Sequence, residues 1–320
     1  MTEHWHAWIE CEGMDFEPEI IPYVSLLFEE GERMRVFYRR GIRIVYERVS
    51  KVDKRRIFLR IRDKMIKKYG YYMKKSASFM TGLRIDTDFS SWEEVKKAIS
   101  ILSGFPATVF VHVSAIKEIE PVEGIEFGLH CYEHREFEDE KEFEEDIRRG
   151  VEFLKRKGIE VRGYASPYGF YRSFFPQVLE KYGFLYSSSF SFMYDLPPIR
   201  NGKVFEVPVH PVAPERFVYA GISLKYALEY FYARMLEAER LGFPFLVYTH
   251  PRFILENPEF MRDLIEILNY GEPVSMFECL NKWRERKKKE RVKPGISSGA
   301  DFMGEVILKL KMLVKEKAQD

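Results

Sequence analysis

The sequence is poor in side-chain amides and in cysteine. Its 320 residues include two Gln, four Asn and three Cys, and the cysteines, Cys11, Cys131 and Cys279, form no Cys-x-x-Cys pair. The lack of such a pair argues against a cysteine-based zinc or redox site. The few, widely separated cysteines favour a reducing compartment. The scarcity of amides beside 32% charged residues is a tendency of thermophilic proteins.

Two kinds of hydrophobic segment are also missing. No basic-then-apolar stretch resembles a secretion signal, and no uncharged apolar run is long enough to form a transmembrane helix. We therefore expect a cytoplasmic protein, with peripheral association at a membrane as an alternative.

Charge is balanced over the whole chain but not along it. Fifty-one basic residues face 50 acidic ones, so the net charge of +1 predicts no polyanion partner and no specific nucleic-acid binding. Residues 1–32 hold nine acidic residues and no Lys or Arg, whereas residues 33–75 hold seventeen basic and three acidic residues. The basic block is either a site for an anionic group or surface, or a solvated face paired with the acidic start.

Short apolar runs alternate with helical patterns from residue 81 onward. This alternation is typical of repeated βα units around a parallel sheet, and seven or eight such units predict an α/β barrel. With 46% hydrophobic residues, the chain can bury a sizeable core. Strands are expected at 81–86, 107–113, 126–130, 161–166, 185–189, 204–210, 243–250 and 273–277, and helices at 91–102, 137–158, 173–183, 223–242 and 258–268.

Different patterns flank the barrel and predict three regions. Residues 1–78 form an N-terminal extension with a hairpin at 33–49 and a basic helix at 54–70. The barrel occupies 79–284. A charged linker and an amphipathic helix at 300–318 complete the chain within 285–320, and this helix needs a partner surface: its own barrel, a second copy in a homo-oligomer, or an anionic membrane.

Two aspartates and two histidines follow strands of the predicted barrel. Asp86 and Asp88 end one strand, and His130 and His134 lie at and four residues beyond the end of another. The carboxyl ends of barrel strands meet at one face, so the four side chains can converge. Two imidazoles and a carboxylate can hold zinc with positions left open for water, although two surface or capping histidines give the same pattern.

Other candidates lie at further strand ends. His250 follows the run at 243–250, where it is either a hydrogen-bonded structural residue or a proton donor. His112 and His210 lack a partner motif, and we interpret both as structural. Pro167 and Tyr168, with Gly169, form either a turn or a rigid loop whose backbone N–H groups stabilise an oxyanion.

The order of these motifs resembles that of the polysaccharide deacetylase family, the NodB-homology carbohydrate esterases of the family 4 type. RIDTDF is similar to the first aspartate motif and EFGLHCYEH to the metal-binding histidine motif. ATVFV, YASPYG and LVYTH follow the family's second strand, third motif and late histidine motif, and PVSMFECLNKW is similar to the closing strand and helix. The resemblance covers residues 79 to about 284.

The resemblance implies a distorted (β/α) barrel that hydrolyses an N-acetyl group on a sugar with a divalent metal, Zn²⁺ first and other transition metals as alternatives. In the family mechanism the metal polarises the acetyl carbonyl and binds the attacking water. The roles that the resemblance implies are general base for Asp86, metal ligands for Asp88, His130 and His134, and general acid for His250.

The third motif matches in part. Tyr168, next to Pro167, matches the residue whose backbone N–H helps to hold the oxyanion, so both are expected to bind substrate. Ala165 stands where the family has an arginine that pairs with the base, and Arg84 or Arg162 are candidates to replace that cation.

Two other departures concern the ligands and the acetyl pocket. Thr87 separates two aspartates that are adjacent in the common family form. The tryptophan that lines the acetyl pocket in many members is absent, and residues 186–198 are candidates to supply that wall.

Three other functions fit parts of the pattern. A barrel impaired by the missing arginine would act as a glycan- or polyanion-binding protein, and allantoinase-like members of the superfamily hydrolyse other C–N bonds. Two histidines and a carboxylate also occur in non-haem iron oxygenases, although in a different fold context. The sequence thus predicts a metal-dependent amide hydrolase acting on an N-acetylated carbohydrate, with these as alternatives.

Overall fold

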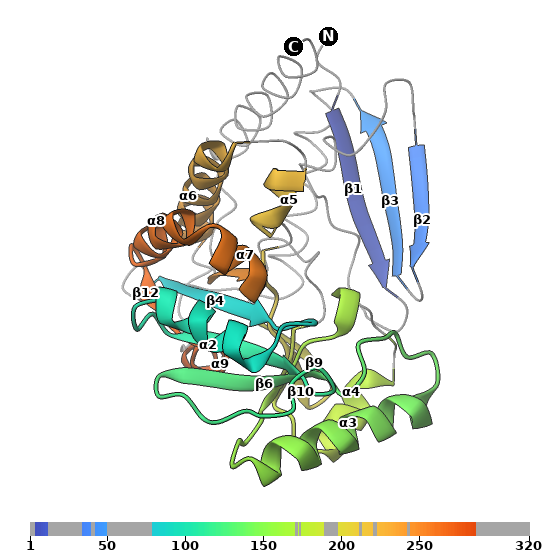
Figure 1. Ribbon diagram of the computed structural model, residues 1–320. Coiled ribbons are helices and arrows are strands. Elements are labelled where there is room, and N and C mark those ends of the chain that lie inside the picture. Colours follow the sequence, from blue (N-terminus) through green and yellow to red (C-terminus); the bar gives the residue numbers. More distant parts are fainter. Residues whose placement is uncertain are drawn as a thin grey trace.

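Figure 1 shows the protein as a computed structural model. The structure describes residues 79–169, 172, 174–188, 198–210, 213–219, 223–241 and 244–285, and the backbone of three strands within the first 49 residues. The expected basic helix at 54–70, the charged linker, the C-terminal helix at 300–318 and most of the expected pocket wall lie outside these residues. The three-region division, the anionic partner and the homo-oligomer stay predictions.

The three N-terminal strands form an antiparallel sheet of their own. Strands β2 (Met34–Arg39) and β3 (Ile42–Val49) pair as a hairpin, which confirms the prediction for 33–49. Strand β1 (His4–Cys11) pairs with the other edge of β3 and was not predicted. Its alternation of Trp5, Ala7 and Ile9 with other residues is the period of a strand, but the acidic composition of residues 1–32 gave no such indication.

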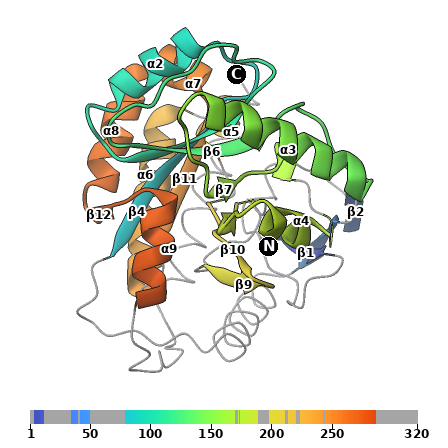
Figure 2. The ribbon, with the colours of Figure 1, turned by 90° about the horizontal axis from the view of Figure 1, so that it is seen from below.

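The main sheet contains seven parallel strands in one curved path, which confirms the distorted α/β barrel (Figures 1 and 2). The backbone N–H of His210 donates to the carbonyl oxygen of Leu246 at 2.6 Å, and this bond links the two ends of the path. In spatial order the strands are β11 (Phe245–Thr249), β4 (Met80–Asp86), β5 (Ala107–His112), β6 (Ile125–Cys131), β7 (Gly163–Tyr164), β8 (Tyr186–Ser187) and β10 (Val204–Glu206).

Two short strands extend this sheet. Strand β9 (Ile199–Asn201) pairs antiparallel with β10, and β12 (Glu272–Pro273) pairs parallel with β4. The predicted strand at 273–277 is therefore wrong beyond Pro273, because helix α9 begins at Met276. Ser275 and Glu278 exchange backbone and side-chain hydrogen bonds as a helix-capping box, a pattern that Ser-x-x-Glu indicates in the sequence.

Helices cover the outside of the curved sheet. Helices α2, α7 and α8 pack against one another, and α3 packs on α4 and on strand β6 (Figures 1 and 2). None of the described helices has both the length and the apolar composition needed to cross a membrane. The helices are α2 (Trp92–Ile101), α3 (Glu140–Arg156), the 3-10 helix η2 (Pro167–Gly169), α4 (Phe175–Lys181), α5 (Glu215–Tyr219), α6 (Leu224–Leu241), α7 (Pro251–Glu256), α8 (Pro258–Leu268) and α9 (Met276–Glu285).

Strand periodicity separates the core from the site. On β4, Leu83 and Ile85 belong to the apolar cluster between sheet and helices. Arg84 and Asp86 alternate with them and so face the barrel interior, where the Arg84 guanidinium lies over the rings of Phe110 and Tyr248. Polar groups are therefore gathered inside the barrel, at the carboxyl ends of its strands.

Candidate active site

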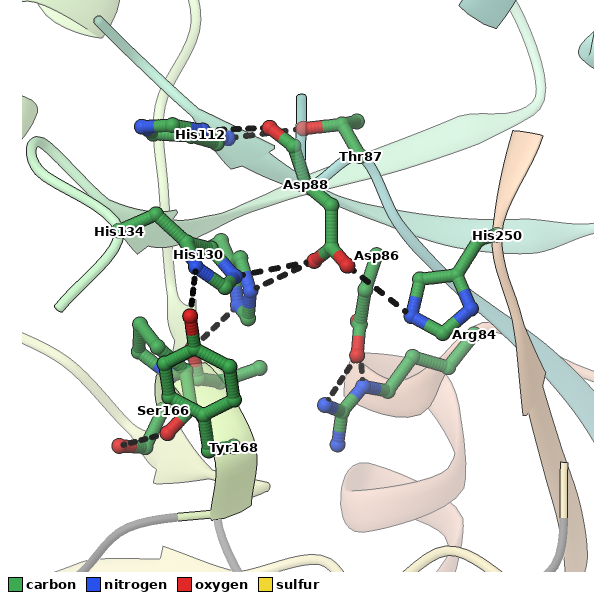
Figure 3. Close-up of polar contacts among 12 residues, drawn as sticks. Arg84, Asp86, Thr87, Asp88, His112, His130, His134, Ser166, Tyr168 and His250 are labelled. Carbon is green, nitrogen blue, oxygen red and sulfur yellow. Dashed lines mark hydrogen bonds and ion pairs between the residues drawn. The ribbon is translucent and has the colours of Figure 1, made fainter. Parts of the chain in front are cut away.

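The predicted catalytic and metal-binding side chains come together at the carboxyl ends of three strands (Figure 3). Asp86 ends β4, and Asp88 lies two residues beyond that strand. His130 lies at the end of β6, with His134 on the following loop, and His250 comes directly after β11. Parallel strands bring residues from distant parts of the chain to one edge, so the sequence-predicted convergence is observed.

The carboxylate of Asp88 lies at the centre of the site. Its Oδ1 atom is 3.2 Å from Nε2 of His130 and 3.1 Å from Nε2 of His134, and its Oδ2 atom is 3.4 Å from Nε2 of His250. Burial alone would raise the pKa of Asp88. The neighbouring imidazoles of His130, His134 and His250 outweigh that effect and hold the pKa far below its ordinary value, so Asp88 is a carboxylate at neutral pH.

The second ring nitrogen of each metal-site histidine has its own partner. Nδ1 of His130 lies 2.7 Å from the Ala165 carbonyl oxygen, and Nδ1 of His134 lies 3.2 Å from the Tyr168 hydroxyl. A carbonyl oxygen can only accept, so Nδ1 of His130 carries the proton and its Nε2 lone pair is free. Ala165 thus contributes its backbone to the site, although its side chain lacks the family's guanidinium.

These residues fit a divalent metal. Asp88, His130 and His134 each offer one ligand atom, and the three atoms lie within 4.8 Å of one another. Nε2 of His130 is buried and has no hydrogen-bond partner among the described residues, which leaves its lone pair available. Two imidazoles and one carboxylate form a donor set that suits Zn²⁺ and other divalent transition metals and leaves coordination positions open.

His250 is held by a buried glutamate that was not predicted. Oε1 of Glu215 accepts hydrogen bonds from Nδ1 and from the backbone N–H of His250, at 3.0 and 2.9 Å, and from the Thr249 hydroxyl at 2.6 Å. Burial would lower the pKa of His250, but the hydrogen bond and charge of Glu215, with Asp88 and Asp86, raise it to about 9. His250 is therefore protonated at neutral pH and can act as a proton donor.

Asp86 is paired with the arginine on its own strand. Nε and Nη2 of Arg84 donate to the two carboxylate oxygens of Asp86 at 2.6 and 2.5 Å, and both residues are 4% exposed. Nη1 of Arg84 donates to the carbonyl oxygen and the hydroxyl of Ser188 at 2.5 and 3.0 Å. Of the two arginines considered as replacements for the family's cation, Arg84 is the partner of Asp86. Arg162 instead pairs with Glu160.

The Arg84 contact sets the charge of Asp86. Burial would raise the pKa of Asp86, whereas the charge and hydrogen bonds of Arg84 lower it and prevail. Asp86 is therefore ionised at neutral pH. Asp86 lies outside the cluster of ligand-type atoms formed by Asp88, His130 and His134.

Two further residues support the site and were not predicted to do so. The Asp146 carboxylate, on α3, accepts from the backbone N–H groups of Tyr132 and Glu133, each at 2.8 Å, and so holds the loop between the two metal-site histidines. Burial raises the pKa of Asp146 to about 6. His112, interpreted from the sequence as structural, lies beside Asp88, and burial lowers its pKa to about 4.

The substrate-binding candidates lie at the edge of the site. Pro167 is buried, whereas Tyr168 is 48% exposed, with a left-handed backbone (φ 59°) and its ring against His134. The side-chain contact of Tyr168 was not predicted, and the role of its backbone N–H stays a prediction. Phe89, next to Asp88, is 73% exposed, and its ring centroid is 5.0 Å from that of His134. His210, which bonds the Tyr230 hydroxyl at 2.9 Å, is structural as predicted.

Comparison with known proteins identifies the fold. No protein-family model and no curated protein matches the sequence. A proposed polysaccharide deacetylase from Mycobacterium smegmatis has a similar structure, with 18% identity and a TM-score of 0.54 over 69% of this chain and 96% of that one. A mutant of a CE4 family pseudoenzyme shares 17% identity, with a TM-score of 0.46 over 66% and 70% of the chains. The barrel has the polysaccharide deacetylase fold.

Proposed function

We propose that this protein is a metal-dependent hydrolase that removes the N-acetyl group from a sugar or a sugar-containing precursor. The observation that carries the proposal is the position of the Asp88 carboxylate, with His130 and His134 at one oxygen and His250 at the other. A candidate metal-binding set and a candidate proton donor thus lie beside one another at the carboxyl ends of the strands. The fold shared with polysaccharide deacetylases supports the acetylated carbohydrate as the substrate class.

The buried pair of Arg84 and Asp86 supplies the base. Asp88, His130 and His134 would hold a divalent metal, whose Lewis acidity would polarise the acetyl carbonyl and make a bound water more acidic. Asp86 would accept a proton from the attacking water, whose oxygen forms the new bond to the carbonyl carbon. Arg84 occupies both oxygens of Asp86, so it fixes the orientation of the carboxylate and keeps it ionised.

The pair of His250 and Glu215 supplies the acid. The C–N bond of the amide breaks when the leaving nitrogen receives a proton, and the products are acetate and a free amine. His250 carries a proton at neutral pH, and its Nε2 atom faces the Asp88 carboxylate. Glu215 accepts from Nδ1 of His250, which directs Nε2 toward the reacting group.

The non-catalytic alternative loses its main support in this geometry. It was favoured by the absence of the third-motif arginine, but Arg84, on the same strand as Asp86, supplies a guanidinium to that carboxylate. Allantoinase-like hydrolysis of a different C–N bond would use the same side chains, so it is the second candidate. An assay with different substrates distinguishes it from N-deacetylation.

The proposal is tested by metal analysis together with an acetate-release assay. We expect protein purified without chelator to contain about one divalent metal ion per chain, and to release acetate from at least one member of a panel of N-acetylated sugars. Removal of the metal should abolish release, and addition of Zn²⁺ should restore it. Metal-loaded protein that hydrolyses allantoin but no N-acetylated sugar would favour the second candidate, and protein that binds no metal would contradict both.

Glu215→Gln should lower kcat by about tenfold, part of the roughly 10²–10⁴-fold that a positioned general acid supplies. The amide oxygen can still accept from His250, but the charge that raises the pKa of His250 is lost. As the pH rises, His250 therefore loses its proton at a lower pH than in the parent. The alkaline limb of the pH–rate profile should move toward lower pH. Glu239→Gln is the control, because Glu239 lies on α6, is half-buried and accepts from the Tyr270 hydroxyl. An unchanged alkaline limb in Glu215→Gln would contradict the assignment.

Phe89→Ala should raise KM with little change in kcat. Phe89 and Tyr168 are exposed aromatic residues whose rings both contact the ring of His134, and we propose that a sugar ring next to the acetyl group contacts them. We expect a KM increase of about tenfold, which corresponds to about 1.4 kcal/mol of lost binding. Tyr270→Ala removes another exposed aromatic, on the loop after α8, and should leave KM unchanged. Equal KM values for Phe89→Ala and the parent would contradict the proposed contact.

A further inference from the structure

His112 bonds the turn that carries Asp88 (Figure 3). Its backbone N–H donates to Thr87 Oγ1 at 2.8 Å, and its ring Nδ1 contacts the Asp88 carbonyl oxygen. Nε2 lies 2.8 Å from the Ser114 hydroxyl. The residue is 3% exposed, so water does not replace these contacts. Both ring nitrogens are thus engaged at the end of β5, and one of them holds the backbone of Asp88.

The partners of His112 show that it is not a metal ligand. A carbonyl oxygen can only accept, so Nδ1 carries the proton and Nε2 accepts from the Ser114 hydroxyl. His130 and His134 are arranged differently, because their Nε2 atoms face the Asp88 carboxylate. His112 therefore acts on the backbone of a ligand residue and not on the ligand atoms.

The backbone of Asp88 needs such support. Its φ is 41°, in the left-handed region, which is unfavourable by roughly 1–2 kcal/mol for residues other than glycine. The Ser90 N–H donates to the Thr87 carbonyl oxygen at 2.8 Å and closes the turn. His112 then fixes this turn at the Thr87 hydroxyl and at the Asp88 carbonyl. The direction of the Asp88 carboxylate follows from the backbone that these contacts hold.

We infer that His112 is a positioning residue of the metal site, which holds Asp88 in its left-handed conformation so that the carboxylate lies between His130 and His134. The inference rests on the proposed metal-dependent function, but it concerns affinity for the metal and not the chemical step. Outer partners that orient metal ligands typically contribute 10–100-fold to metal affinity.

Space filling alone is the alternative explanation for His112. Its ring also packs against Phe89 and His134, with centroid separations of 5.3 Å in each case. His112→Phe keeps an aromatic ring at this position and removes both polar contacts of the imidazole. His112→Asn places an amide N–H donor close to the position of Nδ1 and so keeps the bond to the Asp88 carbonyl. The two variants therefore separate hydrogen bonding from packing.

The experiment measures the dissociation constants of Zn²⁺ and Co²⁺ in competition with a chromophoric chelator, without substrate. We expect His112→Phe to weaken metal binding by about 10–100-fold, and His112→Asn to recover most of that loss. Thr87→Val, which removes the hydroxyl that accepts from the His112 backbone, should weaken binding in the same direction. His210→Phe is the matched control, because His210 is also buried and is hydrogen-bonded to the Tyr230 hydroxyl. The His210→Phe protein should bind metal with the affinity of the parent.

The experiment distinguishes failure of the inference about His112 from failure of the proposed deacetylase function. If the parent binds metal and His112→Phe and Thr87→Val bind it equally well, the inference is overturned while the metal site stands. If the parent binds metal with the expected losses in the variants but releases no acetate, the inference stands and the deacetylase proposal fails. Should His112→Phe not fold, as judged by circular dichroism, the comparison of Thr87→Val with the parent decides.

Discussion

Asp86→Asn should leave the metal content unchanged while turnover falls by about 10²–10⁴-fold, the usual contribution of a positioned general base. Asp86 is not one of the three clustered ligand residues, and both its oxygens are held by Arg84. The substitution removes the negative charge that accepts the proton but leaves Asp88, His130 and His134 in place. Metal content by mass spectrometry and acetate release are measured on the same folded preparation.

Asp88→Asn is the matched comparison for Asp86→Asn, because it makes the same chemical change two residues away. It weakens a proposed metal ligand, so metal content and activity should fall together. An Asp86→Asn protein that turns over at the parent rate would remove Asp86 from the mechanism. Loss of metal in Asp86→Asn would instead place that carboxylate among the ligands.

Arg84→Met should destabilise the fold by about 3–5 kcal/mol, the usual effect of removing one partner of a buried ion pair. The change leaves the Asp86 carboxylate buried without a cation and also removes the bonds to Ser188. Methionine keeps the length and apolar character of the side-chain stem, so the loss reports the charge and its hydrogen bonds. Urea denaturation at neutral pH measures the free energy of unfolding.

The destabilisation in Arg84→Met should depend on pH in a defined direction. In the parent, Arg84 holds the pKa of Asp86 below its ordinary value, so the ionised pair stabilises the fold above the unfolded-state pKa of about 3.9 and loses that contribution as the pH falls through the folded-state pKa. The difference between the parent and Arg84→Met should therefore be largest near neutral pH and shrink in acid.

Two variants serve as controls for Arg84→Met. Arg162→Met removes an exposed ion pair with Glu160 and should change stability by less than about 1 kcal/mol. The double variant Arg84→Met with Asp86→Asn should recover part of the loss, because no unpaired charge is then buried. Equal stabilities of Arg84→Met and Arg162→Met would show that the pair with Asp86 contributes little.

Local sequence patterns predicted which residues gather at the site wherever the period of a strand, or a position just after a strand, determines where a side chain lies. Arg84 precedes Asp86 by two residues, and the period of a strand places both on one face, where they form their ion pair. Asp88, His130 and His134 follow strands of a predicted parallel barrel, whose carboxyl ends share one face. By contrast, β1 and the true start of α9 were missed, although the alternation in residues 4–11 and the Ser-x-x-Glu pattern at Ser275 were in the sequence.

The sequence by itself determined the succession of βα units and the chemical types at the strand ends, because these depend on periods of two and 3.6 residues within short segments. Only the tertiary structure decided which distant groups meet there. Glu215 reaches His250 from 35 residues away, the Ala165 carbonyl reaches His130 from 35 residues away, and His112 reaches Asp88 from 24 residues away. Strand order, register and curvature bring these partners together, and each of those depends on packing across the whole barrel.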